Sequence, residues 1–442
     1  MSVISKLTNF GAAGAGGADS YWIALLGGSS YDTGWAVTLD SSGNIIVAGV
    51  TQSDGAGSGD LLTAKYDSLG SLQWARTLGG SAYDQATGVV VDSSDNIYIC
   101  GVTQSDGAGS NDAIIAKYNS SGTLQWDYTL GGSSVDRFNA IAIDSSNDIV
   151  AFGSVASDGA GSNDLLIAKY NSSGTLQWDR TLGGSSADYG DGVAIDSSDN
   201  IIVAGNTQSD GAGSADGLIA KYNSSGTLQW SRTLGDTGLD RFNGVNVDSS
   251  DNIIAAGYHQ PDGTTTRKGL VAKYNSSGTL QWHRILDGAT NEEFYFVTAD
   301  SSGNIIAVGR TDSDGEGSND CLIAKYNSSG VLQWDKTLGG TGSDVFNGVT
   351  VDASDNIIVA GRTESDGAGS GEILTAKLPP DGTGDGTYGS LVYQDAVLTD
   401  SAGSLTDSAA VLTDAAAVLT SAAAVLTDSA AVLTEELIEV TP

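Results

Sequence analysis

Short apolar runs recur along most of the chain, and clusters of Asp, Ser, Asn and Gly separate them. Residues 192–235 read GVAIDSSDN-IIVAGNTQSDGAGSAD-GLIAKYNSSGT-LQWSRTLG and hold four such runs, in which Val, Ile, Leu, Tyr and Trp dominate. The runs have the length and composition of strands, and no stretch between 21 and 378 keeps a sustained helical period. The spacing therefore predicts four short strands joined by tight turns in this segment.

The same four-run unit repeats with a fixed period. The tripeptide LQW recurs so that its tryptophans are 52 residues apart, and the tryptophan of YWIALLGG lies one further step back. Units of four strands and about 50 residues, repeated four to eight times, are typical of a β-propeller. The chain is therefore predicted to be all-β, with 21–378 forming a seven-bladed propeller of four-stranded blades. The repeated tryptophans, expected to be structural, are Trp22, Trp74, Trp126, Trp178, Trp230, Trp282 and Trp334.

The phase of the repeat favours a closed ring over an open solenoid. The last unit stops at LTAKL (374–378), and PPDGTGDGTYG follows where an LQW strand is due. The spare copy of that strand lies at 21–26, near the other end of the chain. A solenoid needs distinct capping units, and an unclosed ring leaves an unpaired edge at each end. We therefore expect the N-terminal strand to close the ring, after a short arm at 1–20.

The repeated residues resemble a known family. DQATGVVVDSSDNIYICG (84–101) is similar to the core of the SBBP β-propeller repeat, and AKYNSSGTLQW is similar to the strand–turn–strand of quinoprotein-type propellers. The resemblance covers 21–378 and implies a seven-bladed β-propeller. It leaves the function open, because propellers carry many different functions.

After 378 the pattern changes. Residues 379–390, PPDGTGDGTYGS, are predicted to be a linker, and 391–442 repeat the unit LTDSAAV every seven residues. On a helix this period gives an apolar stripe, so we predict a self-associating heptad-repeat stalk, with a trimer as the expected assembly. An intertwined β-stalk, or a segment that folds only on its partner, is the alternative. The leucines expected to mediate oligomerisation are Leu391, Leu398, Leu405, Leu412, Leu419, Leu426 and Leu433.

Charge and composition limit the partners. The chain carries 19 basic and 54 acidic residues, a net charge of -35, which repels nucleic acid and anionic lipid. No apolar run approaches the roughly 20 residues of a membrane span. The first residues make a poor signal peptide, so we expect an extracellular location reached by another route, such as release within a phage particle. Cys100 and Cys321 are expected to be buried free thiols.

Acidic residues recur at fixed places in the unit. Two of them, exemplified by Asp32 and Asp40, are expected to hold turns. A third lies in SDGAGS, usually with another acidic residue six positions on, and oxygen ligands on a glycine-rich loop give a calcium hypothesis. No other cofactor is expected. The candidate ligands are Asp54, Asp60, Asp106, Asp112, Asp158, Asp164, Asp210, Asp216, Asp314 and Asp320.

The sequence offers no catalytic constellation. Its two histidines, His259 and His283, have no zinc spacing, and no Ser–His–Asp set is identifiable. The unbroken 52-residue period leaves no blade-specific insertion to carry chemistry, so we expect no enzyme. The most irregular stretch is 285–300, where the residues EEFYF (292–296) are either repacked core or a local binding patch.

Together these features favour a non-enzymatic display or binding scaffold. The leading hypothesis is a phage virion structural or fibre protein that contacts the host surface, its glycans or other virion proteins. The alternatives are a secreted or surface-anchored bacterial propeller that binds glycans or proteins, and a self-assembling structural spacer.

Overall fold

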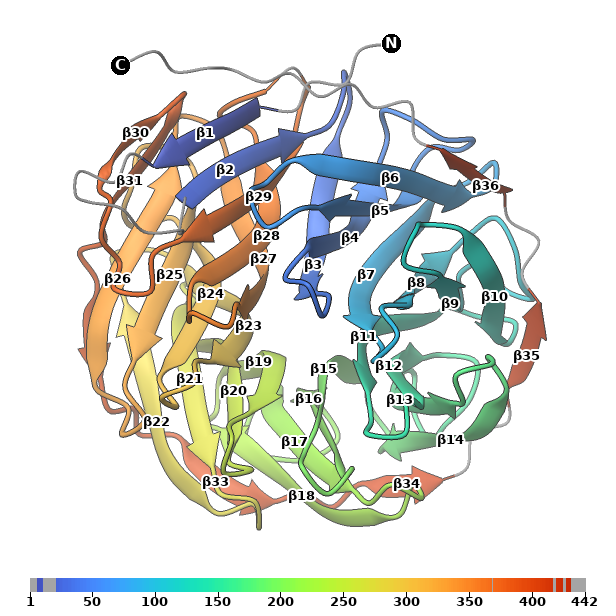
Figure 1. Cartoon of the computed structure of the whole chain (residues 1–442). Coiled ribbons are helices and arrows are strands. Elements are labelled where there is room, and N and C mark those ends of the chain that lie inside the picture. The colour runs from blue at the N-terminus through green and yellow to red at the C-terminus, as the bar shows by residue number, and fades with distance from the viewer. Residues whose placement is uncertain (1–5, 11–20, 368, 416–418, 424–426, 431–442) are drawn as a thin grey trace.

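Seven antiparallel sheets stand around a central axis in the computed structural model, which describes residues 6–10, 21–367, 369–415, 419–423 and 427–430 (Figure 1). Each sheet contains the four strands of one blade, as predicted. The described residues form strands and turns without a helix, and so include no helix that would cross a membrane. The seven-bladed, four-stranded propeller expected from the 52-residue period is therefore confirmed.

The strands of the blades fall into four rings, counted outward from the axis. The first ring consists of β3 (Asp32–Leu39), β7 (Asp84–Val91), β11 (Asp136–Ile143), β15 (Asp188–Ile195), β19 (Leu239–Val247), β23 (Glu292–Ala299) and β27 (Asp344–Val351). The second consists of β4 (Ile45–Thr51), β8 (Ile97–Thr103), β12 (Ile149–Val155), β16 (Ile201–Thr207), β20 (Ile253–Gln260), β24 (Ile305–Thr311) and β28 (Ile357–Thr363). The third consists of β5 (Asp60–Tyr66), β9 (Asp112–Tyr118), β13 (Asp164–Tyr170), β17 (Asp216–Tyr222), β21 (Lys268–Tyr274), β25 (Asp320–Tyr326) and β29 (Glu372–Leu378). The fourth consists of β6 (Leu72–Gly79), β10 (Leu124–Gly131), β14 (Leu176–Gly183), β18 (Leu228–Gly235), β22 (Leu280–Asp287), β26 (Leu332–Gly339) and β2 (Tyr21–Leu26).

The N-terminal strand closes the ring. β2 pairs antiparallel with β29 and places Trp22 opposite Lys377, so residues 21–26 supply the fourth strand of the last blade. Trp22 is fully buried. The closure that the permuted phase predicted is therefore present, and it joins the two ends of the repeat in a single sheet.

The hydrophobic core lies between neighbouring blades. The strand β4 is buried at every one of its seven residues, because each face of the sheet is covered by another blade. One core cluster joins Ile46 and Leu61 of the first blade to Ala86 and Ile99 of the second. Because every blade covers its neighbours, no sheet of the ring is a self-contained unit.

The repeated tryptophans tie each blade to the turn of the next. Gly122, in the NSSGT turn, has a φ of 76°, and a Cβ there would lie 2.9 Å from the ring of Trp74. Only glycine both adopts this conformation and leaves room for the indole. The same contact links Trp178 with Gly226 and Trp230 with Gly278. The period of the tryptophans is therefore the period of the blade contacts.

The first two repeated aspartates hold turns, as expected. Asp40 accepts hydrogen bonds from the backbone N–H groups of Ser42 and Asn44, each at 2.9 Å, and its other oxygen lies 2.7 Å from Lys65 Nζ. The ion pair recurs in every blade. Its other members are Lys117–Asp92, Lys169–Asp144, Lys221–Asp196, Lys273–Asp248, Lys325–Asp300 and Lys377–Asp352.

The C-terminal tail forms a belt around the ring. Its short strands each add a fifth strand to the outer edge of one blade, and β1 (Lys6–Phe10) does the same on β2 (Figure 1). A further strand, β30 (Gly386–Tyr388), precedes the belt and pairs with its first member. The belt strands are β31 (Leu391–Asp395) on β26, β32 (Thr399–Ser401) on β22, β33 (Thr406–Ala409) on β18, β34 (Thr413–Ala415) on β14, β35 (Thr420–Ala423) on β10 and β36 (Thr427–Ala430) on β6.

The predicted helical stalk is therefore wrong for the described part of the tail. The seven-residue period is the step from one blade to the next, taken in the order opposite to that of the blades. Each belt strand has only 3–5 residues, and the chain leaves the sheet between strands. In a continuous strand, side chains alternate between the two faces of the sheet. Because each belt strand pairs with a different blade, this alternation need not continue from one belt strand to the next, and an odd period is compatible with β structure.

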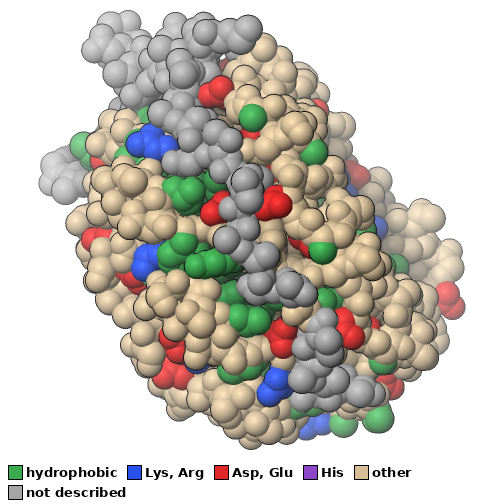
Figure 2. Space-filling model, turned by 90° about the vertical axis from the view of Figure 1, so that its right-hand side faces the viewer, with side chains coloured by type: hydrophobic (Ala, Val, Ile, Leu, Met, Phe, Trp, Pro, Cys, Tyr) green, Lys and Arg blue, Asp and Glu red, His purple; other side chains and the backbone are tan. Residues whose placement is uncertain are grey.

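The heptad leucines pack against the chain's own blades. Leu391 and Leu405 are 1% and 8% exposed, and each belongs to a core cluster. Leu398, Leu412 and Leu419 are partly buried against three further clusters. Hydrophobic side chains gather in a band on the rim seen in Figure 2. Two more predicted oligomerisation residues, Leu426 and Leu433, lie outside the described residues.

Candidate functional site

Each innermost strand contains one extra residue where its pairing with the second strand shifts. In the first blade Gly34 pairs with Gly49 and Ala36 pairs with Ala48, which leaves Trp35 unpaired. A bulge of this kind re-aims the side chain of the extra residue, and all seven bulge residues line one cavity on the axis. They are Trp35, Thr87, Asn139, Asp191, Asn243, Tyr295 and Asn347.

Four bulge residues connect each blade to the next. Asn139 Nδ2 donates to the carbonyl of Gly190 at 2.6 Å, and Asn347 Nδ2 donates to the carbonyl of Gly34 at 2.8 Å. Asn243 and Thr87 make the equivalent bond. Such a bond satisfies a buried backbone carbonyl where two innermost strands approach. At these four positions the bulge therefore has a structural role.

The other three bulge residues break this pattern. An ionised carboxylate such as that of Asp191 has no proton to donate to a carbonyl. Trp35 and Tyr295 are bulky aromatics that occupy the first and sixth blades. Asp191 still joins the fourth blade to the fifth, but through Arg241 instead of a carbonyl. Trp35 and Tyr295 replace the linking residue with an aromatic side chain, so these two positions are candidates for a role other than holding the ring together.

The cavity concentrates positive charge in a strongly acidic chain. It has a volume of about 570 Å³ and includes four of the nine arginines of the chain in its lining. Two carboxylates, Asp191 and Glu293, are also present. The lining therefore carries a net charge of +2 (four minus two), whereas the whole chain carries -35. The arginines are Arg137, Arg241, Arg267 and Arg310.

One arginine forms a forked ion pair with the bulge carboxylate. Arg241 Nε lies 2.9 Å from one oxygen of Asp191, and an NH2 group of the same guanidinium binds the other oxygen at 2.5 Å. Burial raises the pKa of Asp191, and the charge of Arg241 opposes that rise. Asp191 in turn raises the pKa of Arg241 above its ordinary value. The two bonds fix the plane of the Arg241 guanidinium within the cavity.

A second charged group surrounds Glu293, which is 2% exposed. Arg310 lies 3.2 Å from its carboxylate, Tyr295 donates its hydroxyl to it at 2.6 Å, and Arg267 also bonds to it. Burial acts against the charged form of Glu293. The charge of Arg310 and the bonds from Tyr295 and Arg267 outweigh burial and hold its pKa below the usual value. The carboxylate is therefore a fixed anion that positions two cations.

Aromatic and unpaired groups complete the lining. The Arg267 guanidinium lies 4.5 Å from the centre of the Tyr258 ring, a distance typical of a cation–π contact. Trp35 is 37% exposed. Arg137 is exposed, and among the described residues its guanidinium has no hydrogen-bond or ion-pair partner. The lining thus holds both an exposed arginine and exposed aromatic surface.

The sequence identified part of this site. In the irregular stretch, Glu293, Tyr295 and Phe296 line the cavity, whereas Phe294 is fully buried core; a binding patch at this stretch stays a prediction. The arginines were missed, although a signal existed. The residue after the first acidic residue of each innermost strand differs from blade to blade, and two of the four arginines, Arg137 and Arg241, occupy this position. The variants are Thr33, Gln85, Arg137, Tyr189, Arg241, Glu293 and Val345.

The calcium candidates mostly bind backbone groups of their own chain. Asp60 is 1% exposed and accepts bonds from the N–H groups of Gly57 and Ala56. Two of the loop aspartates accept bonds from backbone N–H groups of the belt: Asp314 from Val397 at 2.6 Å and Asp210 from Val411. Among the described residues these pairs form no group of three or more metal-ligating side chains. Calcium binding stays a prediction.

Comparison with known proteins agrees with the fold. Residues 73–107 match the family described as a beta-propeller repeat (SBBP), and 197–228 match a beta-propeller domain of unknown function (DUF5122). An uncharacterized WD repeat-containing protein of Acanthamoeba polyphaga mimivirus is 23% identical over 77% of this chain and 31% of its own length. The regulatory protein FlaEY of Caulobacter vibrioides is 22% identical over 64% of this chain and 36% of its own length. The chain spans about a third of the length of these relatives.

Solved propellers are more distant. The WD40 beta propeller domain of Doa1 is 13% identical over 80% of this chain and 94% of that structure, with a TM-score of 0.47. A gluconolactonase from Xanthomonas campestris is 12% identical over 79% of this chain and 97% of that structure, with a TM-score of 0.38. A fold shared at such identities does not establish an enzymatic activity. The chain therefore has the fold of a seven-bladed β-propeller, and segments of two of its blades are similar to β-propeller repeat families.

Proposed function

We propose that the chain is a non-enzymatic binding scaffold. It captures an acidic segment of a protein partner in the arginine-lined cavity on the axis of the ring. The observation that carries the proposal is the net charge of +2 in this cavity, in a chain of net charge -35. Arginine, tyrosine and tryptophan, which together line it, are the residues that dominate binding energy at protein interfaces.

The arrangement of charges supports an anionic ligand. Arg241, Arg267 and Arg310 are held by Asp191 and Glu293 in fixed positions, so less side-chain entropy is lost when a ligand binds. Arg137 is free to form a charge-assisted bond with a carboxylate. The two carboxylates of the lining, Asp191 and Glu293, are both held in ion pairs with arginines, which suits a binding site of fixed charges.

A labelled acidic peptide tests the proposal. A fluorescein-labelled hexaglutamate peptide should bind the full chain in an anisotropy titration, although the overall charge of the protein repels it. Arg137→Gln should weaken that binding about tenfold, because one charge-assisted bond is lost. The matched control is Arg180→Gln, which removes the same charge from the rim, where Arg180 bonds to the carbonyl of Gly226.

Three results would contradict the proposal. They are absence of peptide binding, equal effects of the two substitutions, and binding of a hexaglutamine peptide as tight as that of hexaglutamate. A uronic-acid oligosaccharide that binds in place of the peptide would reject a protein partner in favour of a glycan.

The setting of this binding is part of the same proposal. We place the scaffold on a phage virion, as a structural or fibre protein, with a secreted or cell-surface bacterial protein as the alternative. A ring whose blade edges are covered by its own belt suits a display role, because exposed sheet edges promote aggregation. Leu391 and Leu405 pack into this chain's own core clusters, so they do not support self-association. Immunogold electron microscopy of purified particles and of producing cells distinguishes the two settings.

A further inference from the structure

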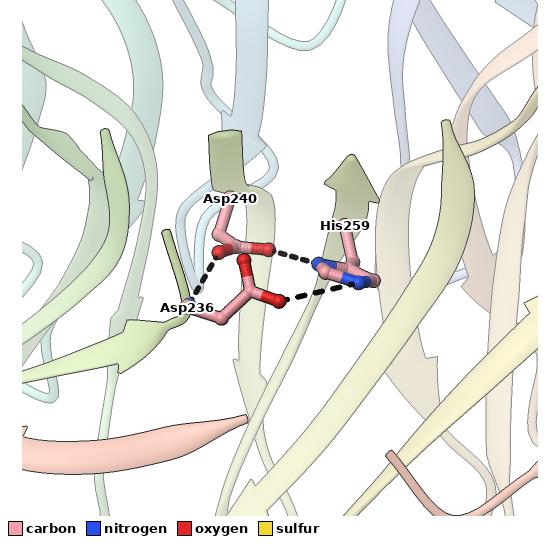
Figure 3. A group of neighbouring side chains, drawn as sticks. All are labelled: Asp236, Asp240 and His259. Carbon is pink, nitrogen blue, oxygen red and sulfur yellow. Dashed lines mark hydrogen bonds and ion pairs between the residues drawn. The ribbon is translucent and has the colours of Figure 1, made fainter. Parts of the chain in front are cut away.

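The junction of the fourth and fifth blades departs from the repeat at two positions that meet in space. Where six other units have glycine, at 28, 80, 132, 184, 288 and 340, this unit has Asp236. Where five others have threonine, at 51, 103, 207, 311 and 363, it has His259. With Asp240, one ligand atom of each residue lies within 4.8 Å of the others (Figure 3).

The ordinary blade shows what this position needs structurally. In the second blade Thr103 Oγ1 donates to one oxygen of Asp84 at 2.5 Å, and Ser105 Oγ donates to the other at 2.6 Å. These hydroxyls satisfy the buried carboxylate and tie two loops together. A threonine is therefore sufficient for the fold, and an imidazole supplies a second nitrogen that the fold does not use.

The hydrogen bonds of Asp240 assign the two imidazole nitrogens. His259 Nδ1 lies 2.6 Å from Asp240 Oδ1, while Asp240 Oδ2 accepts the backbone N–H of Asp236 at 2.9 Å. Because an ionised carboxylate only accepts, Nδ1 carries the proton of the neutral imidazole. The Nε2 lone pair is then directed away from Asp240, with Asp240 fixing the tautomer and the plane of the ring.

That lone pair faces a second acceptor. Nε2 lies 3.9 Å from Asp236 Oδ2, and the side chain of Asp236 is 38% exposed while that of His259 is 11% exposed. Asp236 Oδ1 is already held by the N–H of Gly238 at 2.7 Å, so the carboxylate keeps its orientation. A neutral nitrogen and a carboxylate oxygen that face each other repel unless a cation lies between them.

From this geometry we propose that Asp236 and His259 bind a divalent transition-metal ion, with Asp240 as the residue that positions the imidazole. Nitrogen and carboxylate oxygen together suit Zn²⁺. Ligands about 2.1 Å from a tetrahedral zinc lie about 3.4 Å apart, so the observed 3.9 Å needs a contraction of about half an ångström. The exposure of Asp236 leaves the remaining positions to water.

Calorimetric titration of the untagged, EDTA-treated and desalted full chain with ZnCl2 tests the site. One equivalent of zinc should bind and raise the melting temperature. His259→Thr and Asp236→Gly restore residues that the other blades carry, so both variants should fold. Each should weaken zinc binding by at least tenfold, because loss of even an outer-shell partner of a metal ligand costs about 10–100-fold in affinity. His283→Gln changes the other histidine of the chain and should leave the affinity unchanged.

Several outcomes would overturn the site. Unchanged zinc affinity in both reverted variants would place the ion elsewhere. Wild-type binding no tighter than about 100 µM, some five orders of magnitude short of structural zinc sites, would reject a metal site at these residues. A circular dichroism spectrum identical to wild type confirms that a reverted variant is folded, which keeps loss of binding separate from loss of structure.

Discussion

Removal of residues 391–442 is expected to lower the melting temperature by roughly 10 °C or more and to make the protein aggregate. Loss of a buried leucine side chain alone costs about 2–5 kcal/mol, and the belt buries Leu391 and Leu405 almost completely. Its loss also leaves the outer edges of six blades unpaired. Calorimetry and size-exclusion chromatography of the truncated chain measure both effects.

Two pairs of substitutions within the belt give a matched comparison. Leu391→Ala and Leu405→Ala should each destabilise the protein by about 2 kcal/mol or more. Val397→Ala and Val411→Ala remove atoms from side chains that are 85% and 84% exposed and should have effects within about 0.5 kcal/mol. Equal effects at the leucines and the valines, or an unchanged transition in the truncated chain, would show that the belt does not stabilise the ring.

The free energy of unfolding is expected to rise as the pH falls from about 7 to about 4. Burial, followed by the neighbouring charge of Asp344, raises the pKa of Asp320 from 3.8 to about 6. Asp320 is 1% exposed, and an upper bound on its contribution is roughly 2–3 kcal/mol. Burial also raises the pKa of its equivalents in other blades. They are Asp60, Asp112, Asp164 and Asp216.

The direction in which the free energy of unfolding changes with pH follows from proton binding. Between pH 6 and 3.8 the folded state binds a proton at Asp320 that the unfolded state does not, so acidification favours folding. Asp300 behaves in the opposite way: bonds from Asn304 and Lys325 outweigh burial and lower its pKa, so its contribution is lost at still lower pH. Stability should therefore peak on the acidic side of neutrality.

Urea unfolding at pH 5, 6.5 and 8 measures this dependence. Asp320→Asn should stabilise the protein at pH 8 and reduce the slope between pH 8 and 5, because the carboxamide is neutral throughout. Asp262→Asn, which removes the same charge from an exposed loop, is the control. A slope that Asp320→Asn leaves unchanged would assign the pH dependence to the general repulsion of 54 acidic residues.

The sequence was informative wherever one repeat unit determines its own structure. The 52-residue spacing predicted the blades, because each repeat unit contains its own strands and turn residues. The displaced Trp22 strand predicted the closure, because it is the strand that the last unit lacks. The tail was misread because alanine-rich heptads favour a helix in isolation. In the folded chain the exposed blade edges act as templates, and pairing with them overrides that local preference.

The axial cavity and the Asp236–His259 pair depend on how strands pair with one another, which the repeat pattern of one strand does not show. A bulge at Trp35 or Asp191 follows from the pairing of two strands, so the direction of the side chain was not predictable from the innermost strand alone. Asp236 and His259 are 23 residues apart and meet only because β19 pairs with β20. In both cases the useful signal was the departure of one unit from its copies.

The belt also couples the evolution of the blade repeats to that of the tail heptads, although the two kinds of repeat share no sequence. One blade corresponds to 52 residues in the ring and to seven in the tail. A duplication that added an eighth blade would leave one sheet border bare unless the tail gained a heptad as well, and loss of a blade would leave a heptad with nowhere to dock. The number of short repeats should therefore follow the number of long ones among descendants of this gene, so that tail length records ring size.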